Sequence, residues 1–513
     1  MSDPTIVHVR KFSNLLLSDT AVLIWMAIAL VALHCLTNSQ YGFHRDELNS
    51  LDDGRHLAWG YVDCPPFTPF IARISLTLFG GSLVGLRLFP ALAQGVVLIL
   101  AGLMARELGA ARWGQVVTAL GVAIAPVALS QGSLFMYVAF DLLWWVAAAY
   151  GMICLLKRDD PRWWLWVGAA IGLGMLTRYT MAGLVAGIMA GVFFTPARRY
   201  LRSPWLWAGA GLAFLVFLPN LVWMAQHNFI TLVKLASMHA RDVRVGWTSS
   251  FLPDQLYVSV HIVTIVFWIN GLRFYLLMPA GRRYRPLGWM FVVPFVLFLI
   301  TQGRGYYMAP GYPMLIAAGV TLADLRRRSY SQEGRINLNY WVFCSLASGG
   351  LIAWALATPV APLGSAWWHL ADNMGEGNFS EEVGWPELVH TVASVRDSLP
   401  SADRAGLGVM AGNYGEAGAV DLYGPAYGLP TAISGIDSYW LWGYGDPPPE
   451  TLIVIGLTRS NVDSIFTTCI WAAENTNPYG IVNEENRDHP DIFICRGLRQ
   501  PWPDFWKGFH SFG

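Results

Sequence analysis

The stretch "AVLIWMAIALVALHCLT", residues 21–37, is followed closely by "YGFHRDELNSLDDGRHLAWGYVDCPPF", residues 41–67. The first segment contains no acid, lysine or arginine, and it is long enough to enter a bilayer core of about 30 Å. The second gathers ionisable groups where that span ends, with His, Arg, Asp and Glu in succession at residues 44–47 and Asp63 before two prolines. This order indicates a membrane protein that concentrates charge at one surface of the bilayer.

The composition of the chain supports a membrane protein. Of 513 residues, 54% are hydrophobic and only 13% are charged, whereas a soluble domain carries about 25% charged residues. The formal net charge is zero, and the sequence has neither a basic face nor a known reader motif, so a nucleic-acid partner is excluded. The composition is typical of a polytopic α-helical membrane protein.

Eleven apolar runs are expected to cross the membrane as helices. Several are short for the bilayer core, so their boundaries are approximate. The runs fall at residues 20–37, 83–105, 114–131, 135–156, 163–177, 180–196, 204–225, 256–278, 286–301, 306–323 and 340–358.

Basic residues set the direction of these spans. They cluster in every second connection, as the positive-inside rule predicts for cytoplasmic loops. With eleven spans, this predicts a cytoplasmic N-terminus, and an extracytoplasmic location for segment 41–67 and for the chain from residue 359 onward, in a cytoplasmic (inner) membrane. The first span has no cleavage site after it and is expected to stay as an anchor. The clusters are Arg10–Lys11, Arg106 with Arg112, Lys157–Arg158, Arg198–Arg199, Arg282–Arg283 and Arg326–Arg328.

The chain is expected to divide in two near residue 358. Residues 1–358 would form the transmembrane domain, with a structured first outer loop at 38–82. In that loop, leucines at helical spacing predict a helix at 46–58, and residues 65–80 are apolar but too short to span, which favours a second helix lying in the interface. Residues 359–513 are richer in acids, Gly and Pro, and would form an extracytoplasmic α/β domain.

Short motifs in this second region predict its elements. "GLGVM" (406–410), "TAIS" (431–434) and "TLIVIG" (451–456) are typical of short buried strands, and "WPELVHTVASV" (385–395) of a helix. "GNYGEAG" (412–418) resembles a phosphate-binding loop superficially but lacks the required spacing, so a turn is favoured. In an oxidising compartment a disulfide could join the two cysteines of this region, which are Cys469 and Cys495.

Acids, cations and aromatic residues are expected to meet at the outer ends of the spans. An acid beside cations at that surface suits transfer of a sugar from a lipid phosphate, because the anionic leaving group needs positive charge and the acceptor hydroxyl needs a base. Nucleotide sugars do not reach the outer face, so a donor there would be carried by lipid. The candidate residues are Asp46, Glu47, Asp63, Asp141, Arg45, Arg178, Arg304, His227, Tyr306 and Tyr307.

Structural roles are open for the same residues. The Asp46–Glu47 pair could mark the end of a span, and Asp63 could belong to a turn. Arg178 and Arg304 could anchor lipid headgroups. His227 could be a structural histidine, and Asp141, an acid inside a span, could hold the outer loop by a hydrogen bond.

Several segments resemble a known superfamily. "FHRDEL" (43–48) and "GRHLAWGYVDCPP" (54–66) are similar to the outer-loop signature of C-type (GT-C) multi-span glycosyltransferases, the group of the protein O-mannosyltransferases and the lipid A aminoarabinose transferase. The resemblance continues through "LTRYT" (176–180), "QGRGYYMAPGYP" (302–313) and the region 412–443. It therefore extends over nearly the whole chain.

The resemblance implies a polyprenyl-phosphate-linked sugar donor, inversion at the anomeric carbon, and Asp46 as the catalytic carboxylate with Glu47 beside it. The acceptor would be a lipid, a glycan or a protein. Arg178 and Arg304, with the Tyr306–Tyr307 pair, would lie at the donor phosphate. A divalent metal held by His227 and Asp63 is a further expectation. The aminoarabinose transferase has Glu-Lys where this chain has Asp63–Cys64, so the lysine is lost.

Two other function classes are compatible with a polytopic protein. A transporter or lipid flippase would place charged residues near the bilayer midplane and often show repeated halves, and neither feature is clear here. An assembly protein would use its α/β domain to bind a partner. Aromatic residues of "GIDSYWLWGYG" (435–445) could contact sugar rings or seat the domain on the membrane.

Overall fold

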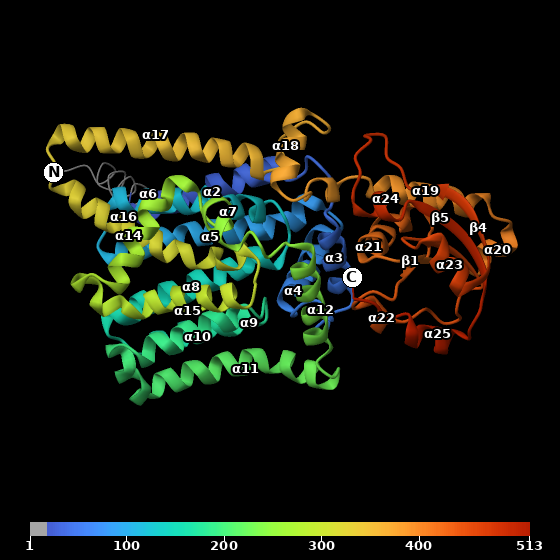
Figure 1. Cartoon of the computed structure of the whole chain (residues 1–513), viewed down its shortest axis with the longest axis horizontal. Coiled ribbons are helices and arrows are strands. Elements are labelled where there is room, and N and C mark those ends of the chain that lie inside the picture. The colour runs from blue at the N-terminus through green and yellow to red at the C-terminus, as the bar shows by residue number, and fades with distance from the viewer. Residues whose placement is uncertain (1–17, 513) are drawn as a thin grey trace, which may run out of the picture.

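The computed structural model describes residues 18–512 and places a helical bundle beside a smaller unit that contains a β-sheet (Figure 1). The predicted basic pair Arg10–Lys11 lies outside the described residues. The helices of the bundle run along the long axis of the molecule, and the sheet unit caps one end (Figure 1). The polytopic helical class with a C-terminal α/β unit is therefore confirmed.

Seven helices of the described region are long and apolar enough to cross a membrane. Bent helix pairs account for three more of the predicted runs, with bends of 68°, 100° and 86°. The seven are α2 (Asp19–Thr37), α5 (Leu83–Leu108), α8 (Tyr137–Arg158), α11 (Pro204–Gln226), η3 with α15 (Pro279–Ile300), η4 with α16 (Gly305–Arg328) and α17 (Gln332–Ala357). The bent pairs are α6 (Arg112–Ala123) with α7 (Pro126–Gly132), α10 (Met181–Phe193) with η1 (Pro196–Arg202), and α13 (Phe251–Tyr257) with η2 and α14 (Ile262–Leu276).

The remaining predicted run, 163–177, forms the 13-residue helix α9 (Trp163–Met175). That helix is shorter than the thickness of a bilayer core, since each residue adds about 1.5 Å. The structure thus gives seven spans, or up to ten if each bent pair is one span, and the predicted count of eleven is not confirmed.

Two helices form within residues 38–82, the segment that the sequence predicts as the first outer loop. Helix α3 (Arg45–Arg55) is capped by His44, and the side chain of Glu47 completes a capping box. Leu48 and Leu51 bury the inner face of α3, while α4 (Phe67–Phe79) follows the two prolines. The short helix α3 is therefore fixed in place at both its first turn and its apolar face.

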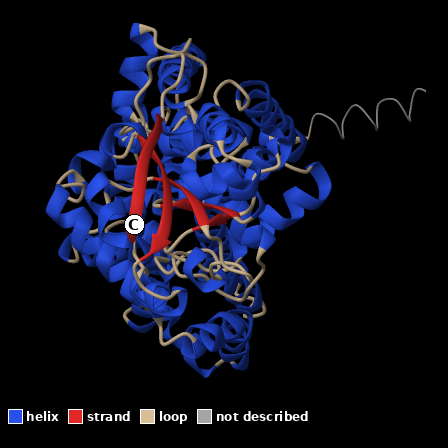
Figure 2. Ribbon diagram, turned by 90° about the vertical axis from the view of Figure 1, so that its right-hand side faces the viewer, coloured by secondary structure: helices blue, strands red, loops and turns tan. Residues whose placement is uncertain are grey.

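The C-terminal unit is built on one five-stranded sheet with strand order β2-β1-β3-β5-β4. Strand β1 is parallel to β2 and β3, and β5 is antiparallel to β3 and β4. Figure 2 looks onto this end, with the strands together in front of the bundle. The strands are β1 (Leu407–Ala411), β2 (Ala432–Ile433), β3 (Thr451–Ile455), β4 (Phe466–Glu474) and β5 (Asp491–Leu498).

The described part of this unit also contains eight α-helices, and the first of them packs on α17. They are α18 (Ala366–Met374), α19 (Trp385–Ser398), α20 (Ser401–Ala405), α21 (Tyr414–Tyr423), α22 (Tyr439–Trp442), α23 (Arg459–Ile465), α24 (Glu484–Asp488) and α25 (Trp502–Gly508). The three predicted strands and the helix at 385–395 are confirmed, whereas β4 and β5 were not predicted. Cys469 and Cys495 lie opposite each other on these two strands and form a disulfide.

The sequence favoured a turn at "GNYGEAG" (412–418). The structure instead places the start of helix α21 there. The side chain of Asn413 caps this helix by accepting a hydrogen bond from the backbone N–H of Gly415 at 2.8 Å. A Cβ on Gly418 would lie 2.7 Å from the Cβ of Leu48, and one on Gly415 would lie 2.8 Å from the Cβ of Arg45. The glycines therefore let α21 pack directly on α3.

Candidate active site

A cleft of about 730 Å³ lies between the bundle, the first outer loop, helix α12 (Ile230–Val245) and the C-terminal unit. Helix α17 contributes an apolar part of its wall, including Ile352 and Leu356. Of the residues singled out in the sequence, this cleft is lined by Arg45, Asp46, Asp63, Arg304 and Tyr306. The other five, Glu47, Asp141, Arg178, Tyr307 and His227, lie elsewhere and are described below.

Asp46 stands in the first turn of α3 and faces the cleft, with 32% of its side chain exposed. Its Oδ1 accepts a hydrogen bond of 2.9 Å from the hydroxyl of Tyr414. Burial raises the pKa of this carboxyl, but His44, Arg45, the Tyr414 hydrogen bond and Arg304 lower it, and the net pKa lies below its usual range. Asp46 is therefore ionised at neutral pH and can accept a proton.

Glu47 is fully buried and held by Arg87 of α5. Arg87 donates hydrogen bonds of 2.8 and 2.7 Å to its two carboxylate oxygens. The backbone N–H groups of His44 and Phe135 donate to the same oxygens at 2.9 and 2.8 Å. These contacts leave Glu47 behind the cleft wall, where it fixes the start of α3.

Arg304 precedes η4 and faces the cleft beside Tyr306. Its Nε and Nη2 each donate a hydrogen bond of 2.7 Å to the two oxygens of Asp242 from α12. Its guanidinium also lies 4.6 Å from the ring centre of Trp247. Arg304 is thus pre-oriented but still partly exposed to the cleft.

Arg178 sits behind Tyr306 among tyrosine rings. Its guanidinium lies 4.8, 5.1 and 4.3 Å from the ring centres of Tyr137, Tyr306 and Tyr307. Its Nη2 donates a hydrogen bond of 3.2 Å to the Tyr306 hydroxyl. The buried carboxylate of Asp141 lies 3.9 Å from Nη1 of Arg178, so both residues support the wall of the cleft.

Arg45 is surrounded by glutamates of the C-terminal unit. It is hydrogen-bonded to Glu484 and lies 3.9 Å from Glu381 and 3.7 Å from Glu485. Burial raises the pKa of Glu485 to about 7, and it also raises that of Glu381. Arg45 therefore binds α3 to the C-terminal unit through ion pairs at the rim of the cleft.

Asp63 faces the cleft beside two other potential metal ligands. Its two oxygens accept hydrogen bonds from Asn49 at 3.0 Å and from Ser438 at 3.3 Å. In the part of the chain that the structure describes, ligand atoms of Asp53, Asp63 and Cys64 lie within 4.8 Å of one another. Oδ1 of Asp53 is buried and has no hydrogen-bond partner among the described residues. Burial raises the pKa of Asp53 and of Asp63, and the charge of Asp63 raises the pKa of Asp53 further. A bound cation would relieve this repulsion between the two carboxylates.

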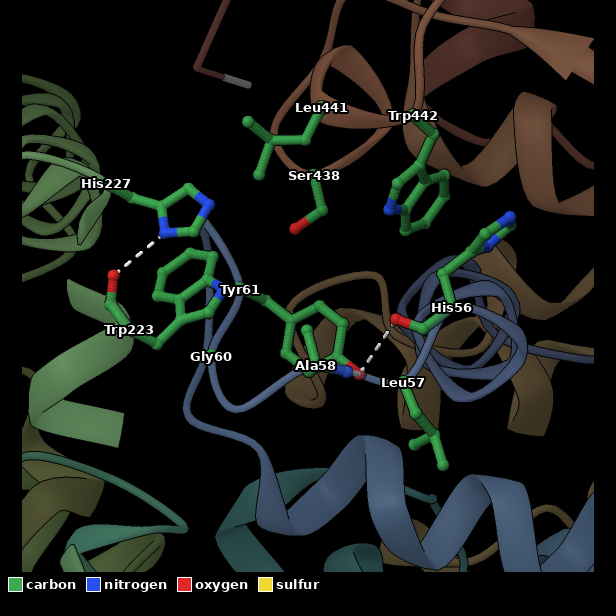
Figure 3. Close-up of a pocket in the computed structure, with 10 residues that line it drawn as sticks. All are labelled: His56, Leu57, Ala58, Gly60, Tyr61, Trp223, His227, Ser438, Leu441 and Trp442. Carbon is green, nitrogen blue, oxygen red and sulfur yellow. Dashed lines mark hydrogen bonds between the residues drawn. The ribbon is translucent and has the colours of Figure 1, made fainter. Parts of the chain in front are cut away.

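His227 lines a separate pocket of about 360 Å³ with Trp223, Tyr61 and Trp442 (Figure 3). Its ring stacks on Trp223 at a centroid distance of 4.0 Å, and its Nδ1 donates a hydrogen bond of 2.8 Å to the Trp223 carbonyl. The expected metal pair of His227 and Asp63 is therefore not brought into one cavity, and the ligand cluster around Asp63 consists of other residues.

The aromatic residues of "GIDSYWLWGYG" pack both within the C-terminal unit and against the loop that carries α3. Tyr439 is buried and donates a hydrogen bond of 2.5 Å to Asp52. Trp440 donates to the carbonyl of Trp506 at 2.8 Å. Tyr444 stacks on Trp502, and Trp442 stacks on His56 beside the second pocket. Two of these rings therefore pack within the unit, and the other two join it to Asp52 and His56.

The structure adds residues that the sequence did not single out. Tyr414 reaches Asp46 from the C-terminal unit, and the buried Lys234 of α12 lines the cleft and binds Asp437 at 2.9 Å. Both come from segments distant in the chain from residues 44–47. The sequence signal that could have indicated Tyr414 and Asp437 was the family resemblance of region 412–443, which includes both residues.

Comparison with known proteins gives matches to lipid-dependent glycosyltransferases. The family model described as dolichyl-phosphate-mannose-protein mannosyltransferase matches residues 63–223. The undecaprenyl phosphate-alpha-4-amino-4-deoxy-L-arabinose arabinosyl transferase 1 of Pseudomonas fluorescens is 26% identical over 291 residues, 52% of this chain and 50% of that protein. The lipid A galacturonosyltransferase RgtD of Rhizobium johnstonii is 27% identical over 231 residues, 44% of this chain and 46% of its own. The chain thus spans about half the length of these relatives.

Solved structures share the fold. ArnT from Cupriavidus metallidurans bound to undecaprenyl phosphate superposes with a TM-score of 0.55 at 14% identity, over 92% of this chain and 97% of that chain. The arabinofuranosyltransferase AftD from Mycobacteria gives a TM-score of 0.50 at 14% identity, over 92% of this chain and 41% of its own.

Fold and cleft together define a multi-pass membrane protein of the GT-C type, with its charged cleft beneath a C-terminal α/β unit. The chain is similar to the GT-C glycosyltransferases that include the protein O-mannosyltransferases and ArnT.

Proposed function

We propose that this protein transfers a sugar from a polyprenyl-phosphate carrier to a lipid acceptor at the outer face of the cytoplasmic membrane, with inversion at the anomeric carbon. The observation that carries this proposal is that Asp46 and Arg304 open into one cleft whose wall is partly apolar. Both relatives are named for lipid-linked chemistry, one for an undecaprenyl phosphate sugar and one for lipid A, which supports a lipid on each side of the reaction.

Asp46 acts as the general base. The acceptor hydroxyl gives its proton to the carboxylate as its oxygen forms a bond to the anomeric carbon. The bond from that carbon to the phosphate oxygen breaks, and the electron pair leaves with the phosphate. The lowered pKa of Asp46 keeps the carboxylate ready to accept the proton at neutral pH.

Arg304 and Tyr306 bind the donor phosphate. Both face the cleft, and the two hydrogen bonds to Asp242 hold the guanidinium of Arg304 in position. A charge-assisted contact of this kind stabilises the negative charge that develops on the leaving group. Arg178 acts through Tyr306 and Tyr307, whose rings it contacts, while Glu47 positions α3 instead of touching the substrate.

A divalent cation would fit at Asp53, Asp63 and Cys64. Two carboxylates and a thiolate form a donor set that suits zinc. When bound, the cation would supply positive charge beside the donor phosphate. The three residues would hold the ion, and the hydrogen bonds from Asn49 and Ser438 would orient Asp63.

Two observations support an extracytoplasmic location for the cleft and the C-terminal unit. The arginine cluster 326–328 ends α16 at the end of the bundle farthest from the sheet unit (Figure 1), as expected for a cytoplasmic end. The Cys469–Cys495 disulfide suits an oxidising compartment. In this arrangement residues 1–358 form the membrane domain and residues 359–513 the extracytoplasmic domain.

The proposal is tested in cells that lack the gene and are complemented with wild-type or Asp46→Asn protein. We expect one polyprenyl-phosphate sugar to accumulate without the gene, with loss of one glycan or glycolipid. Wild-type protein restores the pattern. The substitution keeps size and removes basicity, so transfer falls about 10²–10⁴-fold. Near wild-type restoration by a folded, membrane-inserted Asp46→Asn protein would overturn the proposal and favour a transport or assembly role.

A further inference from the structure

Resting on this proposed function, we infer that the C-terminal unit completes the catalytic site through Tyr414, a positioning residue that holds the carboxylate of Asp46. The hydroxyl of Tyr414 donates a hydrogen bond of 2.9 Å to Oδ1 of Asp46 across 368 positions of sequence. Tyr414 also lines the cleft, so the contact lies at the edge of the proposed reaction centre.

The position of Tyr414 is set by the packing of α21 on α3 and by the cap at the start of α21. Gly415 and Gly418 approach α3 so closely that a Cβ at either position would collide with Arg45 or Leu48. The N-cap hydrogen bond of Asn413 sets the start of α21, where Tyr414 stands. The Tyr414 ring also lies 5.8 Å from the guanidinium of Arg45. Because α21 and α3 are packed together in this way, the backbone at Tyr414 is held beside the helix that carries Asp46.

One hydrogen bond to Oδ1 has two chemical consequences. It leaves Oδ2 as the oxygen that is available to the acceptor hydroxyl. It also favours the ionised form of Asp46, because a donor stabilises a carboxylate and not a carboxylic acid. Other charged or titratable groups also interact electrostatically with Asp46, and these interactions would remain in a protein without the Tyr414 hydroxyl. They are His44 and Arg45 from the same segment, Arg304 before η4, Asp63 after α3, Glu381 of η5 (Ser380–Glu382) and Tyr137 of α8.

The test substitutes Tyr414→Phe, which keeps the ring and removes the hydroxyl. Tyr427→Phe is the matched control, since Tyr427 lies in the same unit and is 40% exposed. The state of Asp46 is read without any substrate, from the pH dependence of its modification by a water-soluble carbodiimide, with peptide mass spectrometry to locate the label. Asp46→Asn provides the blank. The reagent attacks protonated carboxyls, so half-maximal labelling of Asp46 should move to higher pH by about one unit in Tyr414→Phe.

Transfer is then measured with the donor and acceptor that accumulate or disappear in the deletion cells. Tyr414→Phe should lower kcat about tenfold or more, with little change in donor KM, and the acid limb of the kcat profile should move to higher pH. Tyr427→Phe should behave as wild type. An unmoved labelling curve, or a moved curve with wild-type kcat, would overturn the role of Tyr414. Retained transfer by Asp46→Asn would instead overturn the proposed function, and the labelling curve would still report whether the contact exists.

Discussion

Arg87 binds Glu47 through two hydrogen bonds of 2.8 and 2.7 Å inside the protein, and both side chains are fully buried. The same guanidinium also donates to the backbone carbonyls of Asn38 and Gly42 at 3.0 and 3.1 Å. A single side chain from α5 therefore joins the end of the first span to the helix that carries Asp46. The position of the proposed base depends on this pair.

Arg87→Met should destabilise the protein strongly, because it leaves the carboxylate of Glu47 buried without its partner. Breaking a buried pair in this way costs about 3–5 kcal/mol. Thermal unfolding in detergent measures the effect. Arg459→Ala is the control, since its pair with Asp463 is exposed and worth under about 1 kcal/mol. Equal unfolding temperatures for the two variants would show that the pair does not hold the fold.

Glu382 should make the stability of the protein depend on pH. Burial raises its pKa to about 8 although Arg87 lies 3.1 Å away, since Arg87 is already shared with Glu47. The folded state therefore keeps a proton that the unfolded state loses near its ordinary value, about 4.3. Stability should decline as pH rises from about 4.3 toward about 8, with Glu485 contributing in the same direction. Glu382→Gln should flatten this decline. An unchanged slope of unfolding temperature against pH would contradict the assignment.

Arg304→Ala should weaken binding of undecaprenyl phosphate about 10–100-fold, since a hydrogen bond to a charged group contributes about 1.5–3 kcal/mol. Arg178→Ala should have a smaller effect, because Arg178 does not line the cleft itself and contacts it through Tyr137 and Tyr306. Binding to the purified protein in detergent provides the measurement. Acceptor affinity serves as the control, and equal losses for donor and acceptor would remove Arg304 from the phosphate site.

Much of this arrangement follows from local patterns. Apolar runs and arginine clusters predicted the class of fold. Leucine spacing predicted α3, and an apolar run too short to span predicted α4, because both are local properties of the sequence. Strands β4 and β5 were missed. Strand β4 does not alternate between buried and exposed residues, since Thr467 and Thr468 are both exposed, as are Ile470 and Trp471.

The assembly of the site was only partly predictable. Asp46, Asp63 and Arg304 meet in one cleft as expected from their common depth at the outer ends of spans. The separation of His227 from Asp63 depends on how α11 ends and how α12 crosses the cleft, which are tertiary properties. The contact of Tyr414 with Asp46 depends on two glycines whose function is visible only once α21 lies on α3.

Asp63→Asn and Cys64→Ser should each lower the zinc content of the purified protein if Asp53, Asp63 and Cys64 form a metal site. Elemental mass spectrometry of protein purified without a histidine tag measures this directly. His227→Ala should leave the content unchanged, because His227 lies in the second pocket. Loss of zinc in His227→Ala but not in Asp63→Asn would contradict a metal site at Asp53, Asp63 and Cys64. Absence of zinc from the wild-type protein would indicate that protons, and not zinc, neutralise these buried acids.

The orientation of the protein gives the last prediction. A cysteine at Ser401, an exposed residue at the start of α20, should react with a membrane-impermeant thiol reagent in intact spheroplasts. A cysteine at Ser329, exposed just after the arginines that end α16, should react only after the membrane is opened. The wild-type protein controls for labelling of Cys344, which is exposed on α17. The reverse pattern would place Asp46 in the cytoplasm. A nucleotide-linked donor could then reach the cleft, and the argument for a lipid-linked one would lose its physical basis.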